Sequence, residues 1–116
     1  MLFTSVLKDS KGFTRAFKKG AFASNGVVSA HFVRNNTPYN RLGISVTKKV
    51  GGAVERNRAK RIIRAAYRLC EQEIPIGYDI VFSCRPEITD KKSGDIERFI
   101  RNRLVKEINK KSRGNK

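Results

Sequence analysis

The chain contains 116 residues, and its 26 lysine and arginine side chains outnumber its 10 aspartate and glutamate side chains, giving a formal net charge of +16. This length fits one domain, residues 1–116, with a real hydrophobic core, and is too short for two. No stretch reaches the roughly 18 apolar residues that a membrane span requires. The apolar start, Met1–Leu7, lacks the basic residues and the cleavage site of a secretory signal. The charge instead predicts binding to nucleic acid or to an anionic membrane surface.

The positive charge is concentrated in the first 70 residues, since residues 10–70 contain 14 lysine and arginine side chains and a single acid, Glu55. Eight of these cations lie in the segment Lys48–Arg68, most of them on one arc of a predicted helix. Like charges on one arc repel each other by a few tenths of a kcal/mol per pair, so the pattern indicates an external polyanion. A merely solvated basic face is the alternative. We favour nucleic acid over membrane because this helix has no Trp or Phe to insert into lipid.

A short helix is predicted over residues 10–19, with Ser10 as its N-terminal cap and Gly20 at its end. Phe13 and Phe17 lie four residues apart and therefore share a face of this helix. Such a pair is most simply a core contact. The lysine and arginine residues around it also suit it to stacking the bases of a single strand while neutralising the phosphates.

Two segments, residues 21–34 and 41–50, alternate apolar and polar side chains and are predicted to form strands. The Asn25-Gly26 pair is a turn signal, which either divides the first segment into two short strands or marks a bulge. Residues 35–40 form the connecting turn. The apolar positions are Val28, Ala30, Phe32, Leu42, Ile44 and Val46.

The basic helix is predicted over residues 54–73 and is closed by Pro75–Gly77. A short apolar strand follows over residues 78–84, and a last helix over residues 90–110. The predicted apolar stripe of the basic helix is Ala59, Ile62, Ile63, Ala66, Leu69 and Cys70. The predicted apolar side of the last helix is Ile96, Phe99, Ile100, Leu104 and Ile108.

The order of these elements predicts an α+β fold, a two-layer α-β sandwich with the order αβββαβα and with the helices mainly on one face of the sheet. The ordered core is expected to span about residues 8–110. Residues 111–116 are expected to form a frayed, basic C-terminal tail.

Residues for catalysis are sparse. Unaided hydrolysis of a phosphodiester requires an acid and a base within reach of each other, or carboxylates that hold metal ions. His31 is the only histidine, and its place on the polar side of a strand is most simply that of an ordinary surface histidine. Asp79 and the acids of the last helix are expected to be surface carboxylates. We therefore predict no catalytic residue and no metal site. Cys70 and Cys84 lack metal-binding spacing and are expected to be buried free thiols, which favours the reducing cytoplasm.

Three segments together carry a family resemblance: Gly12–Gly20, Leu42–Gly51 and Glu55–Arg64. The chain resembles the protein subunit of bacterial ribonuclease P over roughly residues 10–108. The most specific part is a Gly-x-Ser-Val strand followed by Lys-Lys, a glycine turn and Arg-Asn-Arg-x-Lys-Arg. The resemblance implies an α-β sandwich whose parallel strands flanking the basic helix are joined by a left-handed crossover, the opposite of the usual hand.

In that family the catalyst is a large RNA that uses Mg²⁺ to remove the 5′ leader of precursor tRNA, and the protein binds both that RNA and the leader. The resemblance therefore implies two partners, the catalytic RNA and precursor tRNA, with no cofactor bound by the protein alone and no membrane. The residues expected to bind the catalytic RNA, with Arg68 added from the basic arc, are Lys48, Lys49, Arg56, Asn57, Arg58, Lys60, Arg61, Arg64 and Arg68. The residues expected to form the leader-binding cleft are Phe13, Phe17, His31, Arg56 and Asn57.

Two features depart from the family pattern. His31 stands where relatives often carry a phenol, and the usual strongly basic N-terminus is reduced to Lys8 and Lys11. A ribosomal protein or an RNA chaperone would show the same charge and fold, and the short cleft set is what separates these alternatives. A self-sufficient ribonuclease is disfavoured by the single histidine.

Overall fold

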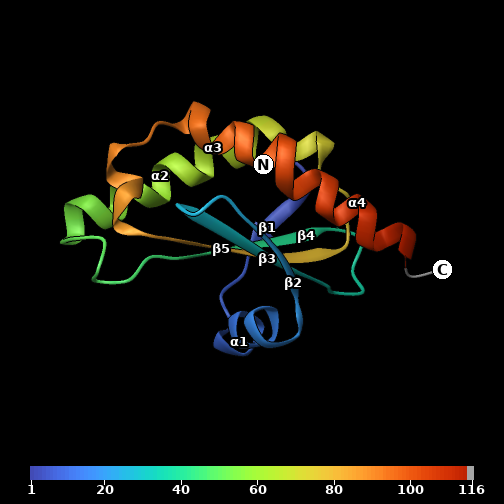
Figure 1. Cartoon of the computed structure of the whole chain (residues 1–116). Helices are drawn as coiled ribbons and strands as arrows, with labels where there is room; N and C mark the ends of the chain where they lie inside the picture. The colour runs from blue at the N-terminus through green and yellow to red at the C-terminus, as the bar shows by residue number, and fades with distance from the viewer. Residues whose placement is uncertain (115–116) are drawn as a thin grey trace.

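The centre of the molecule is one five-stranded mixed sheet, seen in a computed structural model that describes residues 1–114 (Figure 1). The strand order is β1-β4-β5-β3-β2. The β1–β4 and β4–β5 pairs are parallel, whereas the β3–β5 and β2–β3 pairs are antiparallel. The strands are β1 (Thr4–Val6), β2 (Ala21–Ser24), β3 (Val28–Arg34), β4 (Asn40–Ser45) and β5 (Tyr78–Cys84).

The helices lie on both faces of this sheet, but unequally. Helix α1 (Ser10–Lys19) lies alone on one face, and α2 (Ala53–Cys70), α3 (Ser93–Phe99) and α4 (Val105–Gly114) cover the other (Figure 1). Short 3₁₀ turns, η1 (Glu71–Glu73) and η2 (Pro86–Asp90), follow α2 and β5, and a π-helical turn, η3 (Ile100–Leu104), joins α3 to α4. The predicted α+β sandwich is therefore confirmed.

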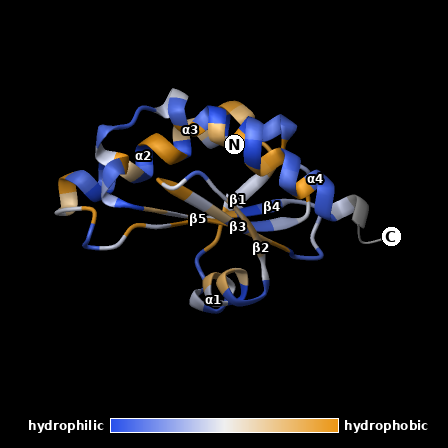
Figure 2. Cartoon of the chain, viewed as in Figure 1, coloured by the Kyte–Doolittle hydropathy of each residue, from blue (hydrophilic) through white to orange (hydrophobic). Residues whose placement is uncertain are grey.

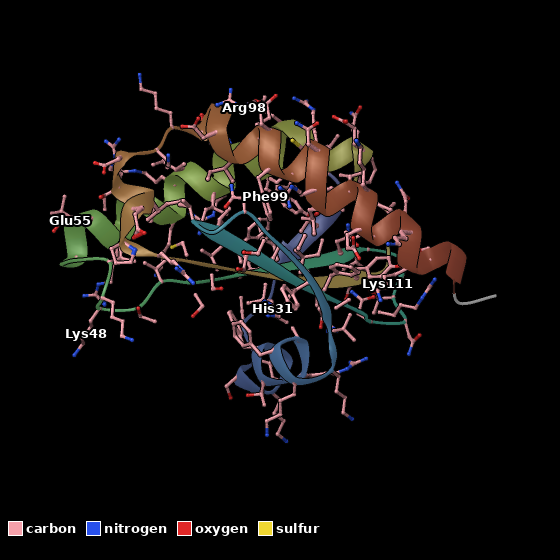
Figure 3. The ribbon with its side chains drawn as sticks, viewed as in Figure 1. His31, Lys48, Glu55, Arg98, Phe99 and Lys111 are labelled. Atoms are coloured by element: carbon pink, nitrogen blue, oxygen red, sulfur yellow. The ribbon has the colours of Figure 1, made fainter. Side chains whose placement is uncertain are left out.

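Successive side chains along the strands point to opposite faces of the sheet, and each face has its own hydrophobic core. Val28, Ala30 and Phe32 of β3 face the large helical layer and are buried, as predicted. The predicted apolar side of the last helix is also buried throughout, and Figure 3 shows Phe99 directed toward the sheet. On the other face a smaller core joins Leu7, Ala16 of α1 and Val81 of β5.

The buried stripe of α2 differs from the prediction at two positions. Leu69 is 62% exposed, whereas Tyr67 is fully buried. Tyr67 follows Ile63 by four residues and so lies on the same stripe. Its hydroxyl shares a hydrogen bond of 2.9 Å with the Thr4 hydroxyl of β1, a partner that the helical period could not reveal. Helix α1 is capped by Asp9 rather than Ser10, since the Asp9 carboxylate accepts a bond from the Lys11 N–H at 2.9 Å.

Strand β1 was not predicted, and the folded part therefore begins before residue 8. It is only three residues long, too short for a periodic signal. Its start is held by Glu71, whose carboxylate accepts bonds from the N–H groups of Leu2 and Phe3 at 2.8 and 3.0 Å. Burial works against ionisation of Glu71, but these bonds and one from Thr4 outweigh it and lower its pKa.

The C-terminal boundaries also differ from the prediction. The last helical segment begins at Ser93 rather than residue 90, and it continues through Gly114, so residues 111–114 belong to α4 rather than to a frayed tail. Residues 115–116 lie outside the described part of the chain. Helix α2 connects β4 to its parallel neighbour β5, which is the crossover that the resemblance implied. Its hand stays a prediction.

Asp79 is not the surface carboxylate that was expected. It is 1% exposed, and its two oxygens accept bonds from the Arg41 guanidinium at 2.6 and 3.1 Å, while Asn35 donates a third bond at 3.1 Å. The side-chain hydrogen bond to Asp79 raises the pKa of Arg41.

Replacing this guanidinium provides a test of the fold. Arg41→Ala leaves the buried Asp79 carboxylate without its ion-pair partner and with the hydrogen bond from Asn35, and we expect the free energy of unfolding to fall by about 3 kcal/mol. Urea denaturation measures this loss. Arg98→Ala, which removes an exposed ion pair with Asp95, is the matched control and should change stability little. Equal losses in the two variants would contradict a special role for the buried pair.

Candidate nucleic-acid interface

The outward face of α2 is a band of cations. Arg58, Arg61, Arg64 and Arg68 are exposed along it, and Arg56 to Arg68 spans about 18 Å at 1.5 Å per residue. Figure 2 shows the mixture of hydrophilic and hydrophobic residues that makes this helix two-sided. We call the following set the basic face: Lys48, Lys49, Arg56, Asn57, Arg58, Lys60, Arg61, Arg64 and Arg68.

The cations of the basic face have no acidic partner within the described residues. All ion pairs found between residues 1 and 114 involve Arg41, Arg98 or Arg101 instead. The one acid of α2, Glu55, accepts a bond from the Gly52 N–H at 3.1 Å and so caps the helix rather than neutralising its face. Unpaired like charges held along a rigid helix are suited to a row of phosphates.

The loop before α2 adds two more cations at the same end of the helix. Lys48 and Lys49 are exposed, and the next residue, Val50, is buried and anchors the loop. Gly51 follows with a φ of +147°, a conformation that side-chain-bearing residues rarely adopt, which explains the glycine turn. Figure 3 shows Lys48 pointing to solvent near the end of α2 that carries Glu55.

Three aromatic rings meet on the other face of the sheet, beside α1. The Phe17 ring contacts the His31 ring edge-on, with centroids 4.9 Å apart, and Phe22 stacks on His31 with centroids 5.4 Å apart and an interplanar angle of 26°. Phe17 is 40% exposed and Phe22 is 59% exposed. Figure 3 shows His31 between the sheet and α1. We call Phe17, Phe22 and His31 the aromatic platform.

Phe13 does not belong to this platform, although it shares a helix face with Phe17. Its ring packs against the smaller core and against Gly43 of β4, where an added Cβ would lie 2.6 Å from the ring. Gly43 is therefore needed for this close approach. The core interpretation holds for Phe13, whereas the exposed Phe17 is free to bind a ligand.

A cavity of about 340 Å³ lies where the two sides of the molecule meet, at the edge of β4. Strand β1 pairs only with residues 40–42, so the second half of β4 has no partner on that side. The cavity is lined by Phe13 from the α1 side and by Lys60 and Arg64 from the basic face. The edge of β4 therefore connects the α1 side with the α2 side.

The structure thus divides the predicted cleft set into three places. Phe17 and His31 are in contact, and Phe13 lies in the β4-edge cavity. Arg56 and Asn57 lie in the first turns of α2, the helix that covers the opposite face of the sheet from α1 (Figure 1). Among the described residues, no hydrogen bond or cation–ring contact was found that joins Arg56 or Asn57 to these aromatic rings.

Phe22 was not among the predicted site residues. A two-residue turn at Asn25-Gly26 would pair Phe22 with Ser29, whereas the observed turn bonds Asn25 to Val28 and pairs Phe22 with His31. The turn signal therefore indicated a hairpin, but not the register that brings the two rings together.

Burial lowers the pKa of His31. Its Nδ1 atom is buried and lacks a hydrogen-bond partner in the described structure, so a proton there would gain nothing. The folded protein therefore favours the neutral ring, whereas the unfolded chain takes up a proton near the ordinary pKa of about 6.5.

This difference predicts a pH-dependent stability. The stability that the folded protein gains from a neutral His31 is complete above a pH of about 6.5. It is lost as the pH falls from there through the lowered pKa of His31 in the folded state. Urea denaturation between pH 7.5 and pH 5 should show a declining free energy of unfolding, with a flatter profile in His31→Phe. His31 is the only histidine. If the free energy of unfolding fell equally with pH in the wild type and in His31→Phe, His31 would not be the cause of the decline.

Comparison with known proteins identifies the family of the chain. The ribonuclease P family model matches residues 2–109. The chain belongs to the ribonuclease P protein family. It is 42% identical over 104 residues to the ribonuclease P protein component of Clostridioides difficile strain 630, covering 89% of this chain and 90% of the relative.

Solved structures of ribonuclease P proteins have the same fold. The protein from Thermotoga maritima matches with a TM-score of 0.77 and 31% identity, covering 89% of this chain and 96% of that one. The Staphylococcus aureus protein matches with a TM-score of 0.75 and 32% identity, covering 90% and 94% of the two chains. The ribonuclease P match includes β1, which places this unpredicted strand within the family domain.

None of the helices between residues 1 and 114 is both long enough and apolar enough to cross a membrane. Within the same range, no three His, Cys, Asp or Glu side chains are grouped so that they could hold a metal ion. Cys70 is buried and Cys84 is half-buried, and both are free thiols.

Proposed function

We propose that this chain is the protein subunit of a ribonuclease P ribonucleoprotein that removes the 5′ leader of precursor tRNA. In this proposal the basic face binds the catalytic RNA and the α1 side of the sheet binds the single-stranded leader. The observation that carries the proposal is the basic face itself, an unpaired band of cations on a helix that is otherwise well packed. Family membership supports the same role.

The leader site is supported by the chemistry of the α1 side. Single strands are bound by flat rings on which bases stack and by cations that follow the phosphates. The aromatic platform supplies exposed rings, and residues 10–34 supply five lysine and arginine side chains without any acid. The cavity at the β4 edge, with Lys60 and Arg64, would let one RNA surface continue from α2 to this side.

The residues of the chain support assigning catalysis to the RNA and RNA binding to the protein. It has one histidine, which contacts two aromatic rings and whose pKa is lowered by burial, and its most buried carboxylate, Asp79, is bound by Arg41. Both observations support a protein that supplies no acid–base pair for hydrolysis. We assign the chemistry to the RNA, which uses Mg²⁺, and to the protein the task of placing positive charge beside crowded phosphates. Its free thiols suit the cytoplasm.

Reconstitution tests this proposal. Purified protein with its cognate RNA should cleave precursor tRNA at Mg²⁺ concentrations where the RNA alone is slow, because the added cations reduce phosphate repulsion. The protein alone should cleave nothing. Cleavage is measured by gel at stepwise Mg²⁺ concentrations, with and without each component.

Two outcomes would contradict the proposal. Robust hydrolysis by repurified, RNA-free protein would assign catalysis to the protein. Equal binding of precursor and mature tRNA, with no effect on cleavage at low Mg²⁺, would instead favour a ribosomal or chaperone role.

A further inference from the structure

Phe22 is an apolar ring that the fold leaves largely in water. It is 59% exposed, more than Phe17, although burying a phenylalanine side chain contributes about 1.5–3 kcal/mol. It lies on β2, the last strand of the sheet, so no cross-strand side chain flanks it on its outer side. Phe22 and Phe17, which is 40% exposed, both contact His31, so the exposed rings form one cluster rather than isolated surface residues. Such a contiguous apolar surface indicates a binding site.

The Phe22 ring is also held in a fixed orientation. Its strand register places it directly opposite His31, and the two rings stack at 5.4 Å and 26°. His31 is in turn held by the edge contact with Phe17. One face of Phe22 is therefore supported by protein, while its exposure leaves the rest of the ring open. A supported flat ring with an open side is suited to stacking a planar ligand.

The charges around the platform select the class of that ligand. Between residues 10 and 34 the chain carries Lys11, Arg15, Lys18, Lys19 and Arg34 and no acid. A second copy of a chain with net charge +16 would be repelled from this surface. Planar groups joined by phosphates are attracted to it, which describes single-stranded RNA.

We propose that Phe22 extends the leader-binding surface by one stacked base, next to the base that contacts Phe17. This inference rests on the proposed function, because it takes the leader of precursor tRNA as the occupant. His31 is then the shared support of two stacking positions, rather than a ligand of the RNA itself.

An abasic scan of the leader tests this assignment. Holoenzyme affinities are measured for precursor tRNAs in which each leader nucleotide in turn lacks its base, with wild-type protein, Phe17→Ala and Phe22→Ala. With an intact leader, Phe22→Ala should weaken binding on the order of five- to a hundredfold. At one leader position the abasic substitution should abolish that loss, since the ring has no base left to stack on. For Phe17→Ala, the abasic substitution that abolishes the loss of affinity should lie at the neighbouring leader nucleotide.

Three further variants separate stacking from simple apolar contact. Phe22→Tyr keeps a flat ring and should retain affinity, whereas Phe22→Leu keeps an apolar side chain and should not. Ile76→Ala removes an apolar side chain that is 50% exposed elsewhere on the surface and should bind like wild type. Circular dichroism and thermal unfolding should be unchanged in all of them.

The outcomes distinguish this inference from the function on which it rests. If Phe17→Ala weakens precursor binding and Phe22→Ala does not, only the inference about Phe22 is overturned. If neither variant affects binding, the leader site itself is overturned. The assignment to a base would also be overturned if Phe22→Ala weakened binding equally at every abasic position. It would be overturned as well if Phe22→Ala abolished binding of an acidic apolar peptide and left the affinity for precursor tRNA unchanged.

Discussion

Replacing Arg58 and Arg61 together by Ala should weaken binding to the catalytic RNA on the order of a hundredfold at low salt, if each phosphate contact contributes about 1.5 kcal/mol. Both side chains are exposed on the basic face, and neither has an acidic partner within the described residues. The salt dependence of binding should change as well. The slope of log K against log salt should fall by somewhat less than two units, because two phosphate contacts are lost. Filter binding at several salt concentrations gives both quantities.

The control for this prediction removes the same charge elsewhere. Lys106 and Lys110 are exposed on α4, a different helix from the one that carries most of the basic face, and their double Ala variant also lowers the net charge by two. This control should keep nearly the wild-type slope and affinity. If both double variants lose affinity equally, overall charge rather than the basic face governs binding. If neither loses affinity while circular dichroism is unchanged, the basic face is simply solvated.

Phe17→Ala should weaken precursor tRNA binding by up to about a hundredfold and leave mature tRNA nearly unaffected, since one base stacked on an aromatic ring is worth about 1–3 kcal/mol. Phe17 is 40% exposed, so its loss should cost little stability. The variant should also lose most of the affinity that is gained when the leader is lengthened from one to several nucleotides. Titrations with leaders of increasing length measure this gain.

Phe13→Ala is the informative comparison, because it removes the same ring from the same helix. Phe13 packs on Gly43 and the smaller core, so this variant should lower the free energy of unfolding. Phe17→Ala should not. Equal losses of affinity for precursor and mature tRNA, or a collapse of thermal stability in Phe17→Ala, would show that Phe17 belongs to the core as well.

Much of the fold could be predicted because it depends on local periodicity. The 3.6-residue period of α2 and of the last helix fixes which side chains face the sheet, and the alternation along β3 does the same. These predictions were confirmed at Ile63 and Ile108. They were wrong at Leu69, because the width of a buried stripe depends on what packs beside it. Strand β1 was missed because three residues are too few for a period, and only its partner β4 makes them a strand.

For the candidate site as well, some residues could be predicted from local periodicity and others could not. The basic face could be read from the sequence, since charges that share a helical arc remain together wherever the helix packs. The leader-cleft set could not be assembled this way, because its members come from α1, β3 and α2. Whether such residues meet depends on how the elements pack, and the sheet separates α1 from α2 (Figure 1). The role of those residues in leader binding stays a prediction.

The sequence by itself determined the net charge of +16, the helical arc that carries most of the α2 cations, the α+β class and the family resemblance. Each of these depends on residues close together in the chain or on composition. Only the tertiary structure decided that Phe13 is packed while Phe17 is open, that Phe22 stacks on His31, and that Asp79 is buried against Arg41. The physical reason is that burial and contact depend on surfaces brought together from distant parts of the chain, whereas the spacing of a side chain shows which face of its own element it lies on but not which residues it will meet there.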